Sequence, residues 1–235
     1  MGSDVARRAF LGVAGAAVAG AAAQAAAAEA SAEAPPAKGI KIVGIACSPR
    51  QGKTTAAAVA VALEAAKGAG PDVEIELIEL AGMSIPAEVA AGVPLAAGRT
   101  DDFPALAPKL ADPRVAGILV GSPVYFNGMS GLCKAFLDRC MVFRKTFALA
   151  GKVAGALAVG GSRNGGQELT IQSIQAALLS HETLVTGTGR PTGRLGAALW
   201  NQGDDISKDE FGLACAKDLG RRVAEAALRQ AAAAK

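Results

Sequence analysis

From Ile40 onward the chain alternates between short apolar segments rich in β-branched residues and longer segments with helical periodicity. This alternation is typical of a parallel sheet whose strands are joined by crossover helices. It predicts five strands, at residues 40–46, 72–79, 115–121, 152–160 and 183–188. It predicts five helices, at residues 54–68, 102–111, 131–143, 167–180 and 208–230.

The strands differ in the placement of their polar residues. Residues 72–79 alternate apolar with acidic side chains, which indicates an edge strand, whereas the first, third and fourth strands are apolar on both faces and are expected to be central. The pattern therefore predicts a doubly wound α/β three-layer sandwich with the strand order 2-1-3-4-5. Ligands of such sheets bind beyond the carboxyl ends of the strands, close to the point where the strand order reverses.

The loop after the first strand carries groups that suit a phosphate. Its sequence, C-S-P-R-Q-G-K-T-T at 47–55, leads directly into a predicted helix. Backbone N–H groups at a helix N-terminus, hydroxyl groups and two cations together supply directional donors and positive potential. The candidate phosphate ligands are Ser48, Arg50, Lys53, Thr54 and Thr55. The alternative is an ordinary polar turn between a strand and a helix.

The same loop is also similar to a P-loop, G-x-x-x-x-G-K-T, with Cys47 in place of the first glycine. A P-loop nucleotide hydrolase is therefore a competing hypothesis. Two observations weigh against it. Cysteine carries a Cβ atom where the loop entry needs none, and neither later central strand ends in the Asp that would hold Mg²⁺.

Two further loops follow the third and fourth strands. The first, at 121–131, contains the only tyrosine of the chain, and the second, at 160–168, has two glycine pairs around Ser-Arg-Asn. Aromatic rings can stack on a planar ligand, and glycine lets the backbone approach one closely. The candidates around such a ligand are Pro123, Val124, Tyr125, Phe126, Asn127, Gly161, Ser162, Arg163, Asn164 and Gly165. The alternative is that the aromatic pair closes a core or a subunit contact.

Composition narrows the class of protein. The chain is 51% hydrophobic but only 4% aromatic, so its apolar content comes mostly from small residues. This excludes an intrinsically disordered chain, and the presence of only 4 Cys excludes a disulfide-dense scaffold. A net charge of +3 provides no basic footprint for nucleic acid. We expect one domain, residues 40–230, followed by an Ala-rich tail at 231–235.

Residues 1–28 are typical of an export signal. Arg7-Arg8 followed by Phe10-Leu11 resembles a twin-arginine motif, and residues 9–28 contain no charged side chain. Small residues around Ala28 suit cleavage. The sequence therefore predicts a periplasmic or otherwise exported protein with a linker at 29–39 and no stable membrane span after cleavage. The alternatives are an uncleaved anchor helix and an Ala-rich disordered N-terminal tail.

Three strings of residues together resemble the NAD(P)H-dependent FMN reductase and multimeric flavodoxin family, especially its iron–sulfur flavoprotein branch. They are S-P-R at 48–50 with T-T at 54–55, G-S-P-V-Y-F at 121–126 with G-x-x-K-A-F-x-D-R at 131–139, and G-G-S-R-N-G-G-Q-E at 160–168. The resemblance implies a flavodoxin-like fold and an FMN cofactor. The first loop would bind the FMN phosphate, and the other two would surround the isoalloxazine ring. NADPH or NADH is the implied donor, and no catalytic side chain is expected because the flavin supplies the chemistry.

Two features depart from the family pattern. The iron–sulfur branch carries a tight cysteine cluster after the second strand, whereas residues 80–101 contain no cysteine, so we expect no iron–sulfur cluster. The cysteines at 47, 133, 140 and 215 lack cluster spacing, and no metal site is predicted. The second departure is the export signal, because NAD(P)H is a cytoplasmic donor.

The leading hypothesis is an FMN-binding oxidoreductase of the NAD(P)H-dependent FMN or quinone reductase type. The second is an exported electron-transfer flavoprotein without NAD(P)H activity, and the third is the P-loop hydrolase. Both flavin hypotheses require a small-molecule or protein redox partner. We also expect a homo-oligomer, because Leu132, Phe136, Leu137, Cys140 and Phe143 would give the predicted helix 131–143 an apolar surface. Asp138 and Arg139 are interpreted as a solvated or interface ion pair.

Overall fold

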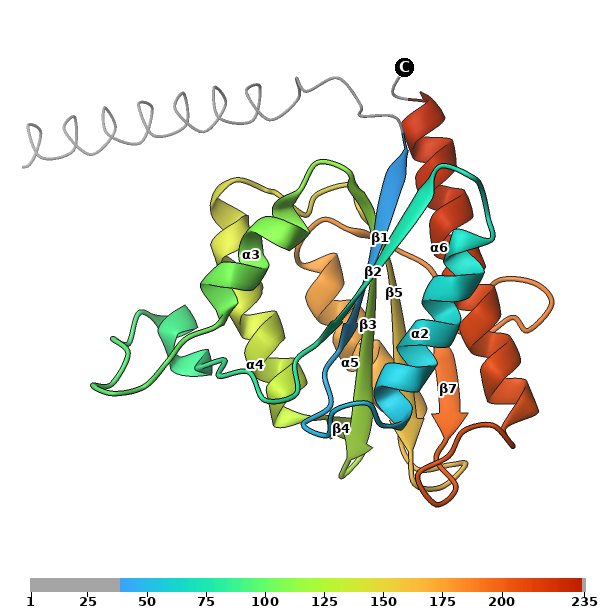
Figure 1. Cartoon of the computed structure of the whole chain (residues 1–235), viewed down its shortest axis with the longest axis horizontal. Helices are drawn as coiled ribbons and strands as arrows, with labels where there is room; N and C mark the ends of the chain where they lie inside the picture. Colours follow the sequence, from blue (N-terminus) through green and yellow to red (C-terminus); the bar gives the residue numbers. More distant parts are fainter. Residues whose placement is uncertain (1–38, 234–235) are drawn as a thin grey trace, which may run out of the picture.

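The computed structural model describes residues 39–233, and the predicted export signal and all but the last residue of the predicted linker lie outside this range. A parallel sheet has the order β2-β1-β3-β5-β6, with helices on both faces (Figure 1). Its strands are β1 (Ile40–Ala46), β2 (Val73–Glu79), β3 (Val115–Tyr125), β5 (Val153–Gly160) and β6 (Leu184–Val185). The predicted doubly wound sandwich is confirmed, with β5 and β6 in the fourth and fifth places.

Helices α2 (Thr54–Lys67) and α6 (Glu210–Ala233) cover one face of the sheet. Helices α3 (Phe103–Ala111), α4 (Gly131–Arg139) and α5 (Gln167–Leu179) cover the other (Figure 1). α2 and α6 approach so closely that a Cβ atom on Gly220 would lie 1.8 Å from the carbonyl oxygen of Ala62. α6 also includes the start of the predicted tail. No helix in residues 39–233 is both long and apolar enough to cross a membrane.

The core has two halves because successive strand residues point to opposite faces. Ile42 packs toward α2 and α6, whereas the next residue, Val43, packs toward the three other helices. Every residue of β5 is buried, as expected of a central strand, while β2 is only partly buried, as expected of an edge strand. The predicted contrast between central and edge strands is thus confirmed.

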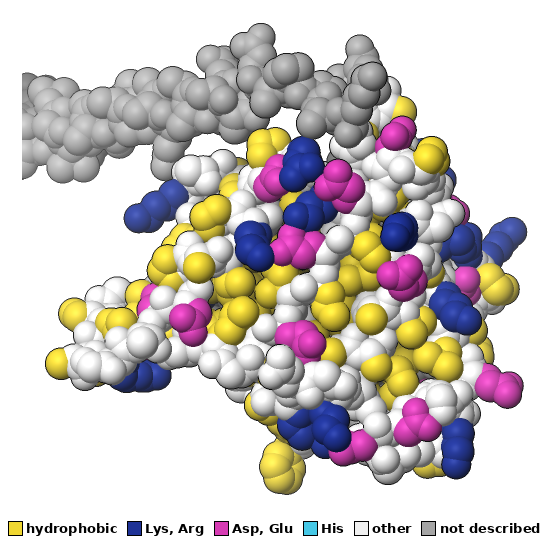
Figure 2. Space-filling model, viewed as in Figure 1, with side chains coloured by type: hydrophobic (Ala, Val, Ile, Leu, Met, Phe, Trp, Pro, Cys, Tyr) yellow, Lys and Arg dark blue, Asp and Glu magenta, His cyan; other side chains and the backbone are white. Residues whose placement is uncertain are grey.

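The outer edge at β2 is lined with paired charges. Glu76 accepts hydrogen bonds from Lys109, at 2.8 Å, and from Lys41, and these bonds hold the pKa of its carboxyl below the usual value. Glu74 pairs with Arg114 at 3.1 Å. Figure 2 shows Lys or Arg side chains interspersed with Asp or Glu on this face of the molecule.

The predicted fifth strand, 183–188, is wrong in its second half. Only Leu184 and Val185 form β6, after which residues 186–196 leave the sheet. The chain then returns as β7 (Ala197–Trp200), which pairs with the carboxyl half of β5. The excursion contains Pro191 and four glycines and is closed by a hydrogen bond from Thr188 N to Arg194 O of 2.8 Å. Turn-forming residues therefore divide one strand position between two short segments.

β3 continues beyond its predicted end at residue 121. It pairs with β4 (Gly128–Met129), and the two strands are joined by a tight turn at Phe126 and Asn127, whose φ angles are 49° and 62°. Positive φ at both central residues is characteristic of the type I′ hairpin turn. Pro123, Val124 and Tyr125 thus belong to a strand and not to a loop.

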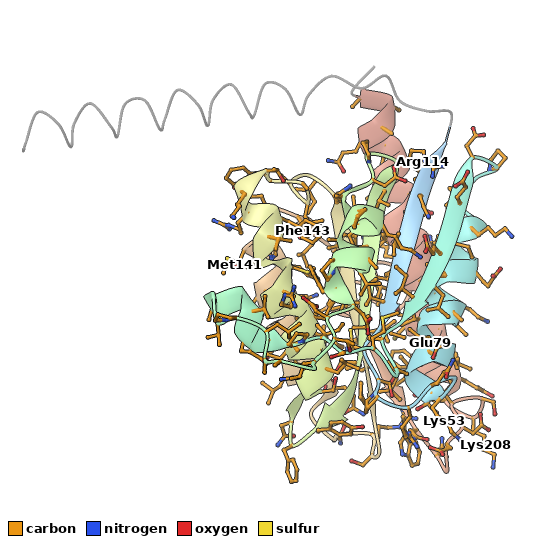
Figure 3. The ribbon with its side chains drawn as sticks, turned by 60° about the vertical axis from the view of Figure 1, so that its left-hand side comes forward. Lys53, Glu79, Arg114, Met141, Phe143 and Lys208 are labelled. Carbon is orange, nitrogen blue, oxygen red and sulfur yellow. The ribbon has the colours of Figure 1, made fainter. Side chains whose placement is uncertain are left out.

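The predicted helix 131–143 is shorter than expected and faces inward. α4 ends at Arg139 and continues as a 3₁₀ helix, η2 (Cys140–Lys145). The apolar surface predicted for an oligomer is wrong, because most of it lies in the core: Leu132 is partly buried, and Phe136, Leu137, Cys140 and Phe143 are buried. Met141 is 57% exposed, in contrast to Phe143 on the same short helix (Figure 3).

Asp138 and Arg139 do not form the surface ion pair that was expected. Asp138 pairs with Lys134 at the surface, whereas Arg139 is buried and makes two bonds of 2.8 Å to Asp101. The guanidinium lies 4.9 Å from the centre of the Phe103 ring. These contacts hold the segment 81–102, which includes η1 (Ala87–Ala91), against α4, and the bond from Arg139 lowers the pKa of Asp101.

Candidate functional site

All three candidate loops lie at the carboxyl end of the sheet. β1, β3 and β5 run parallel, so the segments that follow them meet at one edge. Lys53, Glu79 and Lys208 lie at this end of the molecule, and Arg114 lies at the other (Figure 3). The predicted convergence of the loops is therefore confirmed by the topology.

The first loop presents an open helix N-terminus. α2 begins at Thr54, and its N-cap residue Lys53 makes no side-chain capping bond. The first N–H groups of a helix have no intrahelical acceptor, so they are available to an anion. The hydroxyl-bearing residues Ser48, Thr54 and Thr55 are buried around this N-terminus, and Ser48 Oγ accepts a bond from Arg50 N at 3.1 Å.

Both cations of this loop contact a carboxylate that the sequence analysis did not identify. Asp204 accepts a hydrogen bond from Arg50 Nη1 at 2.6 Å and lies 3.3 Å from Lys53 Nζ. These two contacts lower the pKa of the Asp204 carboxyl. On the other side of the loop, Gly52 N donates to Glu79 Oε2 at 2.7 Å.

The β3–β4 hairpin is fixed at its base and exposed at its tip. Ser130 caps α4 by accepting a bond from Cys133 N, and its hydroxyl donates to Cys47 O at 2.6 Å. At the other end of the hairpin, Tyr125 is 46% exposed and Phe126 is fully exposed. Two aromatic side chains therefore stand at the edge where the candidate loops meet. Pro123 and Val124 are partly buried below them.

The glycine-rich loop after β5 is organised by a buried amide. Gln167 Nε2 donates to Ser162 O at 2.6 Å, and Gln167 Oε1 accepts from Gly165 N at 2.8 Å. This arrangement leaves Gly161, Ser162 and Asn164 exposed. Arg163 is directed toward α6 and β7, where it pairs with Asp209 at 2.9 Å and lies 5.2 Å from the Trp200 ring.

Four segments at this edge form a closed ring of contacts. The first loop joins the segment 201–209 through Arg50 and Asp204, and that segment joins the glycine-rich loop through Asp209 and Arg163. Gly166 of the glycine-rich loop packs against Asn127 of the hairpin. The hairpin returns to the first loop through the bond between Ser130 and Cys47. The predicted site residues are thus parts of one connected structure.

These groups fit the chemistry of FMN. A helix N-terminus with nearby hydroxyls and cations suits a dianionic phosphate. Exposed aromatic rings beside a glycine-rich backbone suit a planar ring system with polar edges. His181 follows α5, which leads away from this edge, and both its burial and the nearby Arg144 lower its pKa. Its position gives it no part in this site.

The cysteines do not fit an iron–sulfur cluster. All four are free and buried in the described chain, and residues 39–233 contain no group of three or more His, Cys, Asp or Glu side chains placed to hold a metal ion. Cluster ligation requires thiolates. Burial raises the pKa of both the Cys47 and the Cys140 thiols, which favours their protonated forms.

Comparisons with known proteins agree with this site. The family described as NADPH-dependent FMN reductase matches residues 40–191. An iron-sulfur flavoprotein of Methanocaldococcus jannaschii is 38% identical over 190 residues, covering 79% of this chain and 96% of its own length. One of Methanosarcina thermophila is 34% identical over 192 residues, covering 79% and 94%.

The fold has counterparts among solved structures. A flavodoxin, a WrbA-like protein from Agrobacterium tumefaciens, superimposes with a TM-score of 0.54 at 19% identity and covers 82% of this chain and 99% of its own. This likeness supports the flavodoxin-like fold. Since the family match spans most of the described chain and the relatives align over nearly their whole length, the protein belongs to the NADPH-dependent FMN reductase family.

Proposed function

We propose that this protein binds FMN at the carboxyl edge of its sheet and works as an oxidoreductase that accepts a hydride from NADPH or NADH. The observation that carries the proposal is the meeting of an open helix N-terminus, an aromatic hairpin tip and a glycine-rich loop at one edge. Membership of the family supports it independently.

The proposal gives each part of the edge a task. The N-terminus of α2 and the groups around it would hold the phosphate, and the hairpin and the glycine-rich loop would hold the ring. The phosphate ligands would be Ser48, Arg50, Lys53, Thr54 and Thr55. When bound, FMN supplies the hydride and electron transfer chemistry, and the protein orients the ring and excludes water from it.

The donor is tested by the visible absorption of the purified protein under anaerobic conditions. A flavin spectrum that bleaches when NADPH or NADH is added supports the reductase proposal. A flavin that bleaches only with dithionite supports the alternative, an exported electron-transfer flavoprotein that receives electrons from another redox protein. The absence of flavin after incubation with FMN would contradict both.

We propose that no iron–sulfur cluster accompanies the FMN, although the relatives named above are iron-sulfur flavoproteins. The proposal rests on the donor set, because the segment 80–101 has no cysteine and the four cysteines are buried in the core, where no three of them are placed together to hold a metal ion in the described residues. Iron and acid-labile sulfide analysis of protein purified without oxygen tests it. About four irons per chain would contradict it.

A P-loop hydrolase remains a minor alternative, since the loop 47–55 differs from that motif at Cys47. Lys53, which stands where a P-loop has the lysine that reaches the nucleotide phosphates, contacts the Asp204 carboxylate in this structure. Calorimetric titration with ATP and Mg²⁺, beside a titration with FMN, separates the two functions. Binding of ATP with Mg²⁺ and not of FMN would favour the hydrolase.

Export is proposed from residues 1–28, and its test is independent of the flavin. Replacing Arg7 and Arg8 together by lysine should retain the chain in the cytoplasm of a host with a twin-arginine pathway. Unchanged export of this variant would contradict the proposal.

A homo-oligomer also remains a proposal, and it cannot use the buried side of α4. Exposed apolar side chains offer a different surface, namely Met141 and Val142 on η2 and Phe147 just after it. Sedimentation velocity measurements of the wild type and of Met141→Glu test this surface. The proposal predicts that the variant loses subunits, and a wild-type monomer would contradict it.

A further inference from the structure

Asp209 is a buried carboxylate at the junction of three elements. It lies immediately before α6 and is 1% exposed. Its Oδ1 accepts from Gly212 N at 3.1 Å, which caps the helix, and its Oδ2 accepts from Trp200 N at 2.7 Å, at the end of β7. A Cβ atom on Gly212 would lie 2.2 Å from Oδ2, so the glycine leaves room for the carboxylate.

The third element joined at Asp209 is the glycine-rich loop. Arg163 Nη2 donates to Asp209 Oδ1 at 2.9 Å, across 46 residues of sequence. The same guanidinium lies 5.2 Å from the centre of the Trp200 ring, and Trp200 Nε1 donates to Gly161 O at 3.2 Å. The loop is therefore held at Gly161 by Trp200, at Arg163 by Asp209, and at Gly166 by its contact with Asn127.

The two partners of the ion pair differ in exposure. The Asp209 side chain is fully buried, whereas the Arg163 side chain is 52% exposed. Two backbone N–H donors stabilise the Asp209 carboxylate without Arg163. Loss of the Arg163 guanidinium therefore leaves the cap of α6 intact and mainly frees the loop. A hydrogen bond between ionised groups, stacked on an aromatic ring, is strong enough to favour one loop conformation.

We infer that Asp209 is a positioning residue, which acts through Arg163 and Trp200 to hold the loop 161–166 where its backbone meets the flavin ring. The inference rests on the proposed function. It assigns Arg163 an indirect role in place of the direct flavin contact that its sequence position suggests. The guanidinium of Arg163 would interact with Asp209 and Trp200 and not with the flavin. The backbone of the loop and the exposed Ser162 and Asn164 would face the ligand instead.

The test uses the full chain and a matched pair of arginine variants. Arg163→Met keeps the length of the side chain and removes its donors and charge. Arg194→Met removes a similar arginine, whose guanidinium lies 5.3 Å from the centre of the Phe211 aromatic ring. Arg194 takes no part in the contacts that join the four segments of the site. We expect Arg163→Met to raise the FMN dissociation constant about tenfold and to alter the fine structure of the flavin absorption band. Arg194→Met should change neither.

Conservative variants separate positioning from a general structural role. Arg163→Lys should restore part of the FMN affinity, because it keeps the positive charge, and Trp200→Phe should lose affinity through the missing bond to Gly161. FMN-free Arg163→Met should melt at a lower temperature than Arg194→Met, because it leaves the buried Asp209 carboxylate with only its two backbone donors, so FMN affinities are compared well below both melting temperatures. Equal FMN affinity and equal spectra for the two methionine variants would overturn the inference.

A measurement without flavin keeps the inference distinct from the proposed function. Hydrogen exchange of the FMN-free protein should show faster exchange at the amide of Gly165 in Arg163→Met, with no change in the segment 186–196. Unchanged exchange would show that the contact between Arg163 and Asp209 does not hold the loop, and would overturn the inference. Faster exchange in the variant, together with a wild type that binds no FMN, would support the role of this contact and overturn only the proposed function.

Discussion

A Cβ atom on Gly166 would lie 2.4 Å from Oδ1 of Asn127 and 2.6 Å from its Cα atom. The backbone of the glycine-rich loop at Gly166 therefore packs directly against Asn127 at the hairpin tip. No space is left for a side chain at position 166. Gly166 also has a φ angle of +98°, which side chains rarely adopt. Two independent physical reasons, conformation and contact, therefore require glycine here.

Gly166→Ala should destabilise the protein by roughly 3 kcal/mol, combining the conformational cost with overpacking against Asn127. Urea unfolding measures the change. Gly82→Ala is the matched control, because Gly82 has a φ angle of +78° but no atom within 4 Å of its Cβ position. It should lose only about 1 kcal/mol. Equal losses for the two variants would contradict the contact.

Asp204→Asn should strengthen FMN binding. The substitution frees Arg50 and Lys53 from a carboxylate, and asparagine tolerates the positive φ angle of 65° at this position. We expect affinity to rise about threefold at low salt and the gain to shrink at higher salt, since these groups are exposed and screened. Fluorescence titrations of FMN at two salt concentrations measure it.

Asp205→Asn is the control for that prediction. Asp205 is the neighbouring exposed carboxylate. Its side chain accepts hydrogen bonds from Ser207 and does not pair with Arg50 or Lys53. Its substitution should leave FMN affinity within twofold of the wild type. Weaker binding in Asp204→Asn would instead show that the carboxylate helps to place Arg50 for the phosphate.

Arg139→Met should destabilise the protein by about 3 to 5 kcal/mol, because it leaves Asp101 with an uncompensated charge in a largely buried position. The double variant Arg139→Met with Asp101→Leu should recover much of this loss. Urea unfolding of the two single variants and the double variant gives the coupling free energy. Additive losses would show that the ion pair contributes nothing of its own.

Lys152 should make stability depend on pH in the alkaline range. Burial lowers the pKa of this ammonium to about 8, while it donates hydrogen bonds to Asp112 O and Val115 O. Between about pH 8 and the unfolded pKa of about 10.4, the unfolded chain binds more protons, so this group makes stability rise with pH. The rise is at most about 3 kcal/mol.

Urea unfolding of the wild type and of Lys152→Met between pH 7 and 10 isolates this group. The difference in unfolding free energy between the two proteins should change in favour of the wild type as pH increases. A difference independent of pH would show that the two carbonyl acceptors keep the ammonium charged throughout the range.

Local patterns were sufficient for much of the fold. Short apolar runs identified β1, β3 and β5, and acidic alternation identified β2 as an edge. β7 could not be predicted, because A-A-L-W is short and lacks β-branched residues. Asn127-Gly128 indicates a turn in this region, but Asn-Gly at the two central positions would place the hairpin turn one residue later than the observed Phe126-Asn127.

The candidate loops were predictable because parallel strands bring their carboxyl ends to one edge. The residues that connect those loops were not. Asp204 lies 154 residues from Arg50, and Asp209 lies 46 residues from Arg163. No local pattern links such partners, and an isolated Asp in a polar loop is typical of many turns. The prediction that Arg139 pairs with Asp138 is wrong for the same reason, because its true partner, Asp101, is 38 residues away in the sequence.

The interrupted fifth strand has a consequence for the behaviour of the protein at high concentration. An exposed, continuous strand at the edge of a sheet can recruit a strand from another molecule and start aggregation. Here one edge is divided, because β6 and β7 are separated by the excursion 186–196. The other edge carries the charged pairs of Glu74 and Glu76. Both sides of an otherwise very apolar sheet are thus poor templates for strand addition, and the described domain should resist intermolecular β-pairing.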